Sequence, residues 1–246
     1  MAKTFPGFSR KMPAFFRGLA RNNTREWFTP RKGVFEEHVR GPMVELLSFV
    51  NEDLKRFAVD YSVAAPAKTI YRIYRDTRFS KDKTPYKTHI GATFPRAGLS
   101  KHGGGGFYLG VSHEHVEVAG GLYMPPPEEL AAVRGAIARD AKGLLKLIKA
   151  IERSRKVGKL TGARLKRPPK GFEMATAEAG ELLKYKQLYF YQTLPAAVAL
   201  SPRIRREIVS RFELLAEFVE WINRAILAAR ADGAEDERPV RPAPMW

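Results

Sequence analysis

One segment of the sequence, residues 72–89, concentrates the side chains best suited to bind an anion. Its only acids are Asp76 and Asp82. Arginine guanidinium groups match the geometry of phosphate or carboxylate, and lysines on a loop add mobile positive charges. The segment therefore predicts an anion-binding site, with these ligand-binding candidates: Arg72, Arg75, Arg78, Lys81, Lys83, Lys87 and His89.

Asp76 and His89 are the catalytic candidates of this segment, as side chains that could transfer a proton. In an enzyme they would act as catalytic acid or base while Arg75, Arg78 and Lys83 hold the negative charge of a substrate. A structural interpretation is also open, in which Asp76 forms an ion pair with the arginines beside it in a solvated loop. The absence of a paired carboxylate or catalytic triad weakens the enzyme interpretation without removing it.

A second basic stretch has the geometry of a helix. At about 100° per residue, its cations fall within an arc of about 80°, opposite a face of leucine and isoleucine. Such a face suits a phosphate backbone or an anionic surface, and it also matches an ordinary solvated helix face. The ligand-binding candidates of this stretch are Lys142, Lys146, Lys149 and Arg153, with Lys156 at the end of the arc.

Positive charge is localised along the chain. There are 43 lysine and arginine residues against 26 aspartate and glutamate residues, a formal charge of +17. Residues 68–101 contribute +7 and residues 142–170 contribute +10, so the remaining segments sum to zero. This distribution predicts two basic surface elements on an otherwise balanced protein.

Several kinds of site are excluded by what the sequence lacks. Without cysteine there is no disulfide, no thiolate nucleophile and no cysteine-ligated zinc. The glycines at 103–106 match neither a phosphate-binding loop nor an esterase motif with its serine elbow, and are expected to form a flexible loop. His113 and His115 flank a turn without a recognisable ligand set, so we expect neither a metal nor a cofactor.

The first sixty residues show apolar side chains at three- and four-residue spacing, which predicts two or three helices. Thr29 before a proline suits the cap and first turn of one helix. Gly41 before a proline should kink or split the next, because proline removes a hydrogen bond and clashes with the preceding turn.

The middle of the chain changes to short runs rich in β-branched and aromatic residues. The connections of about three to a dozen residues are too short for crossover helices, so an antiparallel meander is expected. The expected strands are 69–75, 87–94, 107–112, 116–123 and an added fifth at 187–193.

The second half predicts three further helices. Glu128 follows three prolines at the start of one, Asp140 begins the basic helix, and Ser201 caps a long amphipathic helix. These elements predict an α+β fold: an antiparallel meander sheet of four to five strands packed with N-terminal and C-terminal helices. Residues 1–232 are expected to form a single compact domain, and residues 233–246 a flexible proline-rich tail.

The N-terminus lacks the apolar core of a signal peptide, and no apolar run reaches the roughly 18 residues of a membrane span. We therefore expect a soluble, cytoplasmic protein.

Several motifs resemble a known family. They are the stretch Asn22-Asn23-Thr24-Arg25-Glu26-Trp27-Phe28, residues 73–91 (IYRDTRFSKDKTPYKTHIG), and shorter matches at 106–109, 120–123 and 165–172. Together they resemble the bacterial family of domain of unknown function 2461, over most of residues 5–225. The resemblance implies one compact domain and brings no activity or catalytic residue with it.

Three functions follow from the charge. The first is recognition of a phosphate-rich anionic ligand, with nucleic acid the leading case, through the two basic elements. The second is an enzyme acting on an anionic substrate through the cluster between Arg75 and His89. The third is docking of an acidic protein partner.

Overall fold

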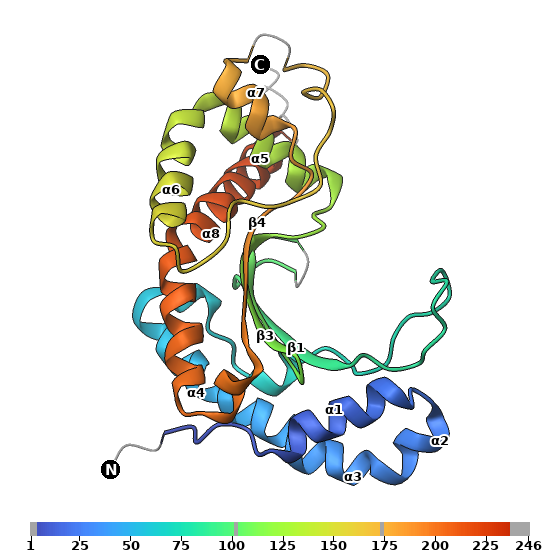
Figure 1. Ribbon diagram of the computed structural model, residues 1–246. Helices are drawn as coiled ribbons and strands as arrows, with labels where there is room; N and C mark the ends of the chain where they lie inside the picture. The colour runs from blue at the N-terminus through green and yellow to red at the C-terminus, as the bar shows by residue number, and fades with distance from the viewer. Residues whose placement is uncertain (1–3, 101–102, 173–174, 237–246) are drawn as a thin grey trace, which may run out of the picture.

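A four-stranded antiparallel sheet lies at the centre of the protein, with its strands in the order of the chain (Figure 1). The computed structural model describes residues 4–100, 103–172 and 175–236. The strands are β1 (His89–Pro95), β2 (Gly106–Ser112), β3 (His115–Leu122) and β4 (Leu188–Pro195). The predicted α+β fold with a meander sheet is confirmed.

The two faces of the sheet differ because side chains alternate along each strand. One face is apolar and packs on α8, where Phe107 stacks on Phe212 with ring centroids 4.7 Å apart. Gly120 lets this helix approach closely, because a Cβ there would lie 3.0 Å from the side chain of Leu215. The opposite face carries a polar or tyrosine side chain from each strand, among them Thr93, Tyr108, Glu117 and Tyr191, and is not covered by a helix in Figure 1.

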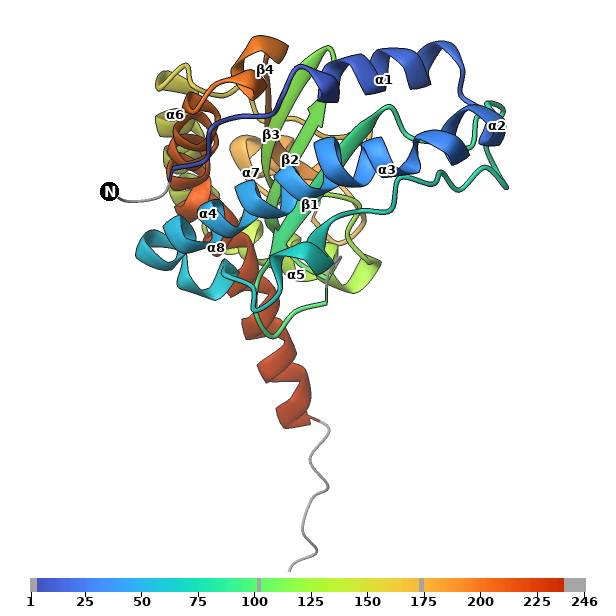
Figure 2. The same ribbon diagram turned by 90° about the horizontal axis from the view of Figure 1, so that it is seen from below.

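The helices cover the apolar face and both ends of the sheet (Figures 1 and 2). Helix α8 crosses the sheet with α4 beside it, α1 to α3 lie at one end, and α5 to α7 lie at the other. Their bounds are α1 (Lys11–Arg21), α2 (Arg25–Phe28), α3 (Lys32–Phe35), α4 (Gly41–Phe57), α5 (Pro127–Arg139), α6 (Ala141–Arg153), α7 (Ala177–Leu183) and α8 (Arg203–Asp236).

The N-terminal helices begin differently from the prediction. Thr24 caps α2, since its hydroxyl accepts a hydrogen bond from the amide of Trp27 at 3.2 Å. The predicted cap at Thr29 is wrong, because Thr29 lies inside a short 3-10 turn that links α2 to α3. The expected break at Gly41 takes the form of a π-helical turn, Glu36–Arg40, directly before the proline of α4.

The predicted strand at 69–75 is wrong. This stretch pairs with its neighbours only through the isolated bridges of Ile70 to Ala92 and Tyr74 to Tyr86. Proline at position 85 cannot donate a hydrogen bond, so the pairing between the two sides stays irregular. Residues 70–88 instead form a long irregular hairpin, here called the arm, which projects on the open side of the sheet (Figure 1).

The later helices begin where predicted. Asp140 caps α6 by accepting from the amide of Gly143 at 2.8 Å, and the hydroxyl of Ser201 accepts from the amide of Arg203 at the start of α8. Helix α8 continues to Asp236, past the predicted start of the tail; the rest of that tail, 237–246, lies outside the described residues.

Of the helices that the structure describes, none combines the length and apolarity that crossing a membrane requires.

Candidate functional site

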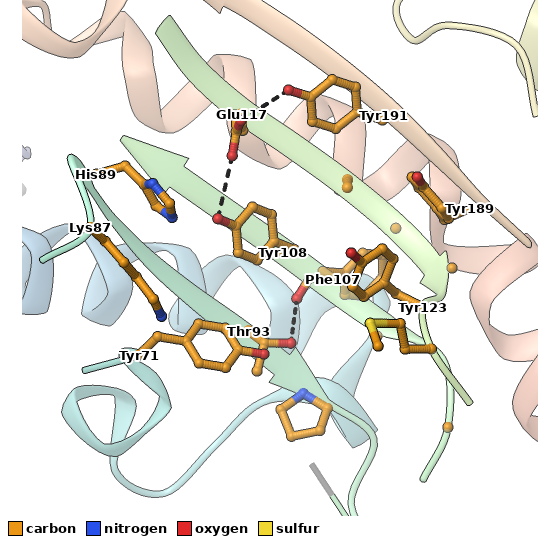
Figure 3. A pocket seen from close by; sticks show the side chains of 17 residues that line it. Tyr71, Lys87, His89, Thr93, Phe107, Tyr108, Glu117, Tyr123, Tyr189 and Tyr191 are labelled. Atoms are coloured by element: carbon orange, nitrogen blue, oxygen red, sulfur yellow. Dashed lines mark hydrogen bonds between the residues drawn. The ribbon is translucent and has the colours of Figure 1, made fainter. Parts of the chain in front are cut away.

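The open face of the sheet holds a cavity of about 800 Å³ (Figure 3). Its size lies within the range of small-molecule sites, roughly 300–1,000 Å³. Tyrosines line much of it, and three ionisable side chains from β1, β3 and the base of the arm gather at one end: Lys87, His89 and Glu117. This is the combination of aromatic wall and few polar groups that small-molecule sites use.

Two glycines make room for the central tyrosine of the cavity. Gly91 and Gly110 are partners across β1 and β2, and a Cβ on either would lie 2.7 or 2.8 Å from the hydroxyl of Tyr108. The side chain of Tyr108 therefore lies across the strands, with its hydroxyl directed to Glu117.

Glu117 is the main hydrogen-bond acceptor of the site. Its carboxylate accepts from the hydroxyl of Tyr191 at 2.9 Å and from that of Tyr108 at 3.3 Å, and His115 Nε2 lies 3.0 Å away. Burial, followed by the nearby carboxylate, raises the pKa of Tyr191 to about 12 and raises the pKa of Tyr108 as well. Both phenols stay protonated and serve as donors. A carboxylate offers about four acceptor positions, so one remains for a ligand.

Lys87 and His89 enter the cavity from the same side, two residues apart (Figure 3). The Lys87 ammonium lies 5.3 Å from the ring centroid of Tyr71, and burial together with Arg72 lowers the pKa of Lys87. Burial also lowers the pKa of His89, although Glu117 partly opposes the shift, so the imidazole is neutral at pH 7. Within the described part of the chain, neither side chain forms a hydrogen bond or ion pair with another residue.

The other candidates of residues 72–89 lie on the arm, away from the cavity lining. Arg75 pairs with Asp82 and also bonds Thr84, while Arg78 pairs with Asp76 through contacts of 2.7 and 3.0 Å. Hydrogen bonds from Arg78 lower the pKa of Asp76 to about 2, so Asp76 is ionised at neutral pH.

Three cations of the arm keep their charge without a carboxylate partner among the described residues. Lys83 Nζ donates to the carbonyl oxygen of Thr77 at 2.9 Å, and Arg72 and Lys81 are exposed. The ion pairs thus shape the arm, and the net positive charge stays at its surface.

The second basic stretch forms α6 and places its cations on the outer face of this helix. Its apolar face is buried in the core through Leu144, Ile148 and Ile151. The four predicted candidates are exposed: Lys142, Lys146, Lys149 and Arg153. Figures 1 and 2 place α6 and the arm at opposite ends of the molecule, so the two basic elements do not form one surface.

The glycine segment beside the cavity is held by one buried side chain. The Asn223 amide accepts from Gly105 N at 2.8 Å and donates to Gly105 O at 2.9 Å and to the hydroxyl of Tyr61. Gly104 and Gly106 on either side line the cavity. The segment is therefore anchored to α8, in contrast to the flexible loop expected from its composition.

Sequence reasoning missed Glu117, Tyr108 and Tyr191. A signal was present, because polar or aromatic residues alternate with apolar ones in three predicted strands. The described residues contain no group of three or more histidine, aspartate or glutamate side chains placed to hold a metal ion.

Comparison with curated proteins finds no match. A family model with the description "Conserved hypothetical protein (DUF2461)" matches residues 11–221. The matched region includes the whole sheet, the arm and every residue that lines the cavity. The chain therefore belongs to the DUF2461 family.

Proposed function

We propose that the cavity on the open face of the sheet binds a small anionic ligand that also carries a planar ring. The observation that carries this proposal is the position of Lys87, a half-buried cation without a carboxylate partner among the described residues, at the polar end of a tyrosine-lined cavity. We base the proposal on this cavity, whose lining includes Lys87 and His89 of the first basic element and none of the candidates on α6.

The charge of Lys87 is the first argument. Burial disfavours a charged ammonium unless an opposite charge lies within a few ångströms. After burial, the second cause of the lowered pKa of Lys87 is the like charge of Arg72, which disfavours the ammonium further. A phosphate or carboxylate of a ligand would supply the missing negative charge, and the neutral His89 beside it can donate one hydrogen bond to the same group.

The tyrosines are the second argument. Tyr123 and Tyr189 meet edge to face at the far end of the cavity, with ring centroids 5.4 Å apart, and Tyr123 is 60% exposed. Aromatic rings favour stacked or edge-on contacts with a planar ring. The one remaining acceptor position of Glu117 suits an amino or hydroxyl group of the ligand. A nucleoside monophosphate is the simplest probe with all three features.

Calorimetric titration with nucleoside monophosphates and aryl phosphates tests the proposal. The native protein should bind at least one probe, and Lys87→Met should weaken that binding at least tenfold. Lys81→Met is the matched control, because Lys81 is exposed on the arm and outside the cavity. Equal weakening by both variants would show that general charge rather than the cavity binds the probe.

His89 favours a second function, acid–base catalysis on the bound ligand. Its imidazole is neutral, faces the cavity and lies near enough to Glu117 for the carboxylate to act on its pKa. A neutral imidazole beside a bound phosphate ester is placed to accept a proton from water. If the protein hydrolyses a bound probe, His89→Asn should abolish turnover and leave probe binding within about threefold of the native value. Turnover that survives the substitution would remove the catalytic role.

A further inference from the structure

The arm extends the surface of the cavity outward. Tyr71 lies near the start of the arm and Lys87 near its end, and both residues line the cavity. From there the arm projects on the open side of the sheet (Figure 1). A nucleic-acid chain that leaves the cavity past Tyr71 and Lys87 therefore meets the arm next. We infer that the ligand of the cavity is the terminal nucleotide of a single-stranded nucleic acid, and that the tip of the arm binds the nucleotides that follow. This inference rests on the proposed function.

The tip of the arm carries an aromatic ring, that of Phe79, which does not pack into the hydrophobic core. Phe79 is 95% exposed, and the Arg78 guanidinium lies 5.7 Å from its ring centroid. Arg78 is itself paired with Asp76, so the ring lies beside a guanidinium held in place and remains exposed to solvent. Exposed aromatic rings beside positive charge are the stacking platforms of proteins that bind single strands, because every base offers a π face.

The charge of the arm matches a phosphate backbone. Residues 72–83 contain five cations and two carboxylates. The pairs Arg75 with Asp82 and Arg78 with Asp76 neutralise two of the cations. Three positive charges therefore remain along the arm, at Arg72, Lys81 and Lys83, and each can neutralise one phosphate.

The arm is also held in shape before any ligand arrives. Asn23 bonds both the amide and the carbonyl of Tyr86, at 3.0 and 2.9 Å, which fixes the base of the arm to the connection between α1 and α2. Near the tip, the Lys83 ammonium bonds the carbonyl of Thr77 across the hairpin. A preformed platform reduces the conformational entropy that ordering would cost on binding.

A single exposed ring argues against a membrane as the partner of this tip. Interfacial segments bury a broad apolar face, and binding strength scales with its area. Phe79 has only charged and polar neighbours in the sequence from Asp76 to Lys83. Base stacking needs one ring face, which this tip provides.

Fluorescence anisotropy with a labelled 5′-phosphorylated single-stranded oligonucleotide, compared with the matching mononucleotide by competition, tests the inference. The oligonucleotide should bind at least tenfold more tightly than the mononucleotide. Phe79→Ala should weaken oligonucleotide binding about 5- to 150-fold, the range for loss of one stacked base, and leave mononucleotide binding unchanged. Lys87→Met should weaken both.

Salt dependence separates the arm from α6. The double variant Arg72→Gln with Lys81→Gln should lower the slope of log affinity against log salt by about 1.4, since two phosphate contacts of a single strand are lost. The matched double variant Lys146→Gln with Lys149→Gln should leave the slope unchanged. A change in the α6 variant alone would overturn the inference.

Two further results distinguish its failure from failure of the proposed function. An oligonucleotide that binds no tighter than the mononucleotide overturns the inference and leaves the cavity as a small-molecule site. If neither the oligonucleotide nor the mononucleotide binds, both the inference and the proposed function are wrong. Sedimentation with vesicles of phosphatidylserine and phosphatidylcholine tests the membrane alternative. Vesicle binding that Phe79→Ala abolishes, together with no oligonucleotide binding, would overturn the inference and assign the tip of the arm to membranes.

Discussion

Replacing Asn223 by leucine tests whether one buried amide holds the glycine segment of the cavity in place. Asn223 is fully buried on α8, and two of its three hydrogen bonds go to the backbone of Gly105, which is also buried. Leucine has a similar size and no polar atoms. The substitution therefore leaves the amide and the carbonyl of Gly105 without a partner in a region closed to water.

The expected cost follows from these two groups. A buried donor or acceptor that loses its partner costs about 1–3 kcal/mol, so the pair should cost about 2–6 kcal/mol. The hydroxyl of Tyr61 adds little, because it keeps its own hydrogen bond to Glu220 at 2.9 Å. At about 2–4 °C per kcal/mol for a domain of this size, the melting temperature should fall by roughly 4–24 °C.

Asn23 provides the matched control. It makes the same pair of bonds to Tyr86, but it is only partly buried, so water can replace the lost partner. Asn23→Leu should then cost only the net value of two hydrogen bonds, about 1–3 kcal/mol.

Urea denaturation followed by circular dichroism measures both variants. The midpoint should move to lower urea for Asn223→Leu with an unchanged slope, which indicates a change in stability alone. A loss below about 1 kcal/mol, or a loss smaller than that of Asn23→Leu, would refute the argument that desolvation of Gly105 controls this region.

Three other predictions concern the cavity itself. Gly91→Ala should cost less than about 1.5 kcal/mol in stability, since only the end of the Tyr108 side chain must move, but it should weaken probe binding. Gly121→Ala should cost about 2 kcal/mol or more, because the φ of Gly121 is +137° and a Cβ there would lie 2.3 Å from a backbone oxygen. The melting temperature should fall as pH decreases below 6.5, because the unfolded chain protonates His89 before the folded protein does, and His89→Asn should flatten that fall; an identical pH profile in the variant would contradict the lowered pKa. Lys87→Met should raise stability by about 0.5–2 kcal/mol while it removes binding, as expected for a functional charge held partly out of water, and a destabilised variant would contradict this.

Local signals in the sequence account for most of the helices and strands. The start of α6 at Asp140 and that of α8 at Ser201 depend on residues within one turn, and both were predicted. The strand prediction at 69–75 rested on the composition of that segment alone. It failed because strand pairing also depends on the opposite side of the hairpin, which contains a proline at position 85. Composition indicates which secondary structure a segment can adopt, but whether it forms a strand depends on the segment that it pairs with.

The candidate site was only half accessible to sequence reasoning. Lys87 and His89 were identified from the charge of their segment, whereas Glu117 and Tyr191 are 74 residues apart and meet only because β4 pairs with β3. The charge distribution predicted two basic surface elements but not their relative position, and the arm and α6 lie at opposite ends of the molecule. Alternation within the strands carries the missing information about which side chains share a face.

The asparagine side chains connect the fold to the site. Asn23, Asn51 and Asn223 each bond both the amide and the carbonyl of one distant residue, as a neighbouring strand would. Two of these contacts border the cavity, since Tyr86 precedes Lys87 and Gly105 lies between two lining glycines. Irregular backbone is expensive to bury without partners, and regular sheet would close the space that the cavity needs. The asparagine side-chain amides supply the hydrogen-bond partners that the irregular backbone needs, so no further strand has to cover the open face of the sheet.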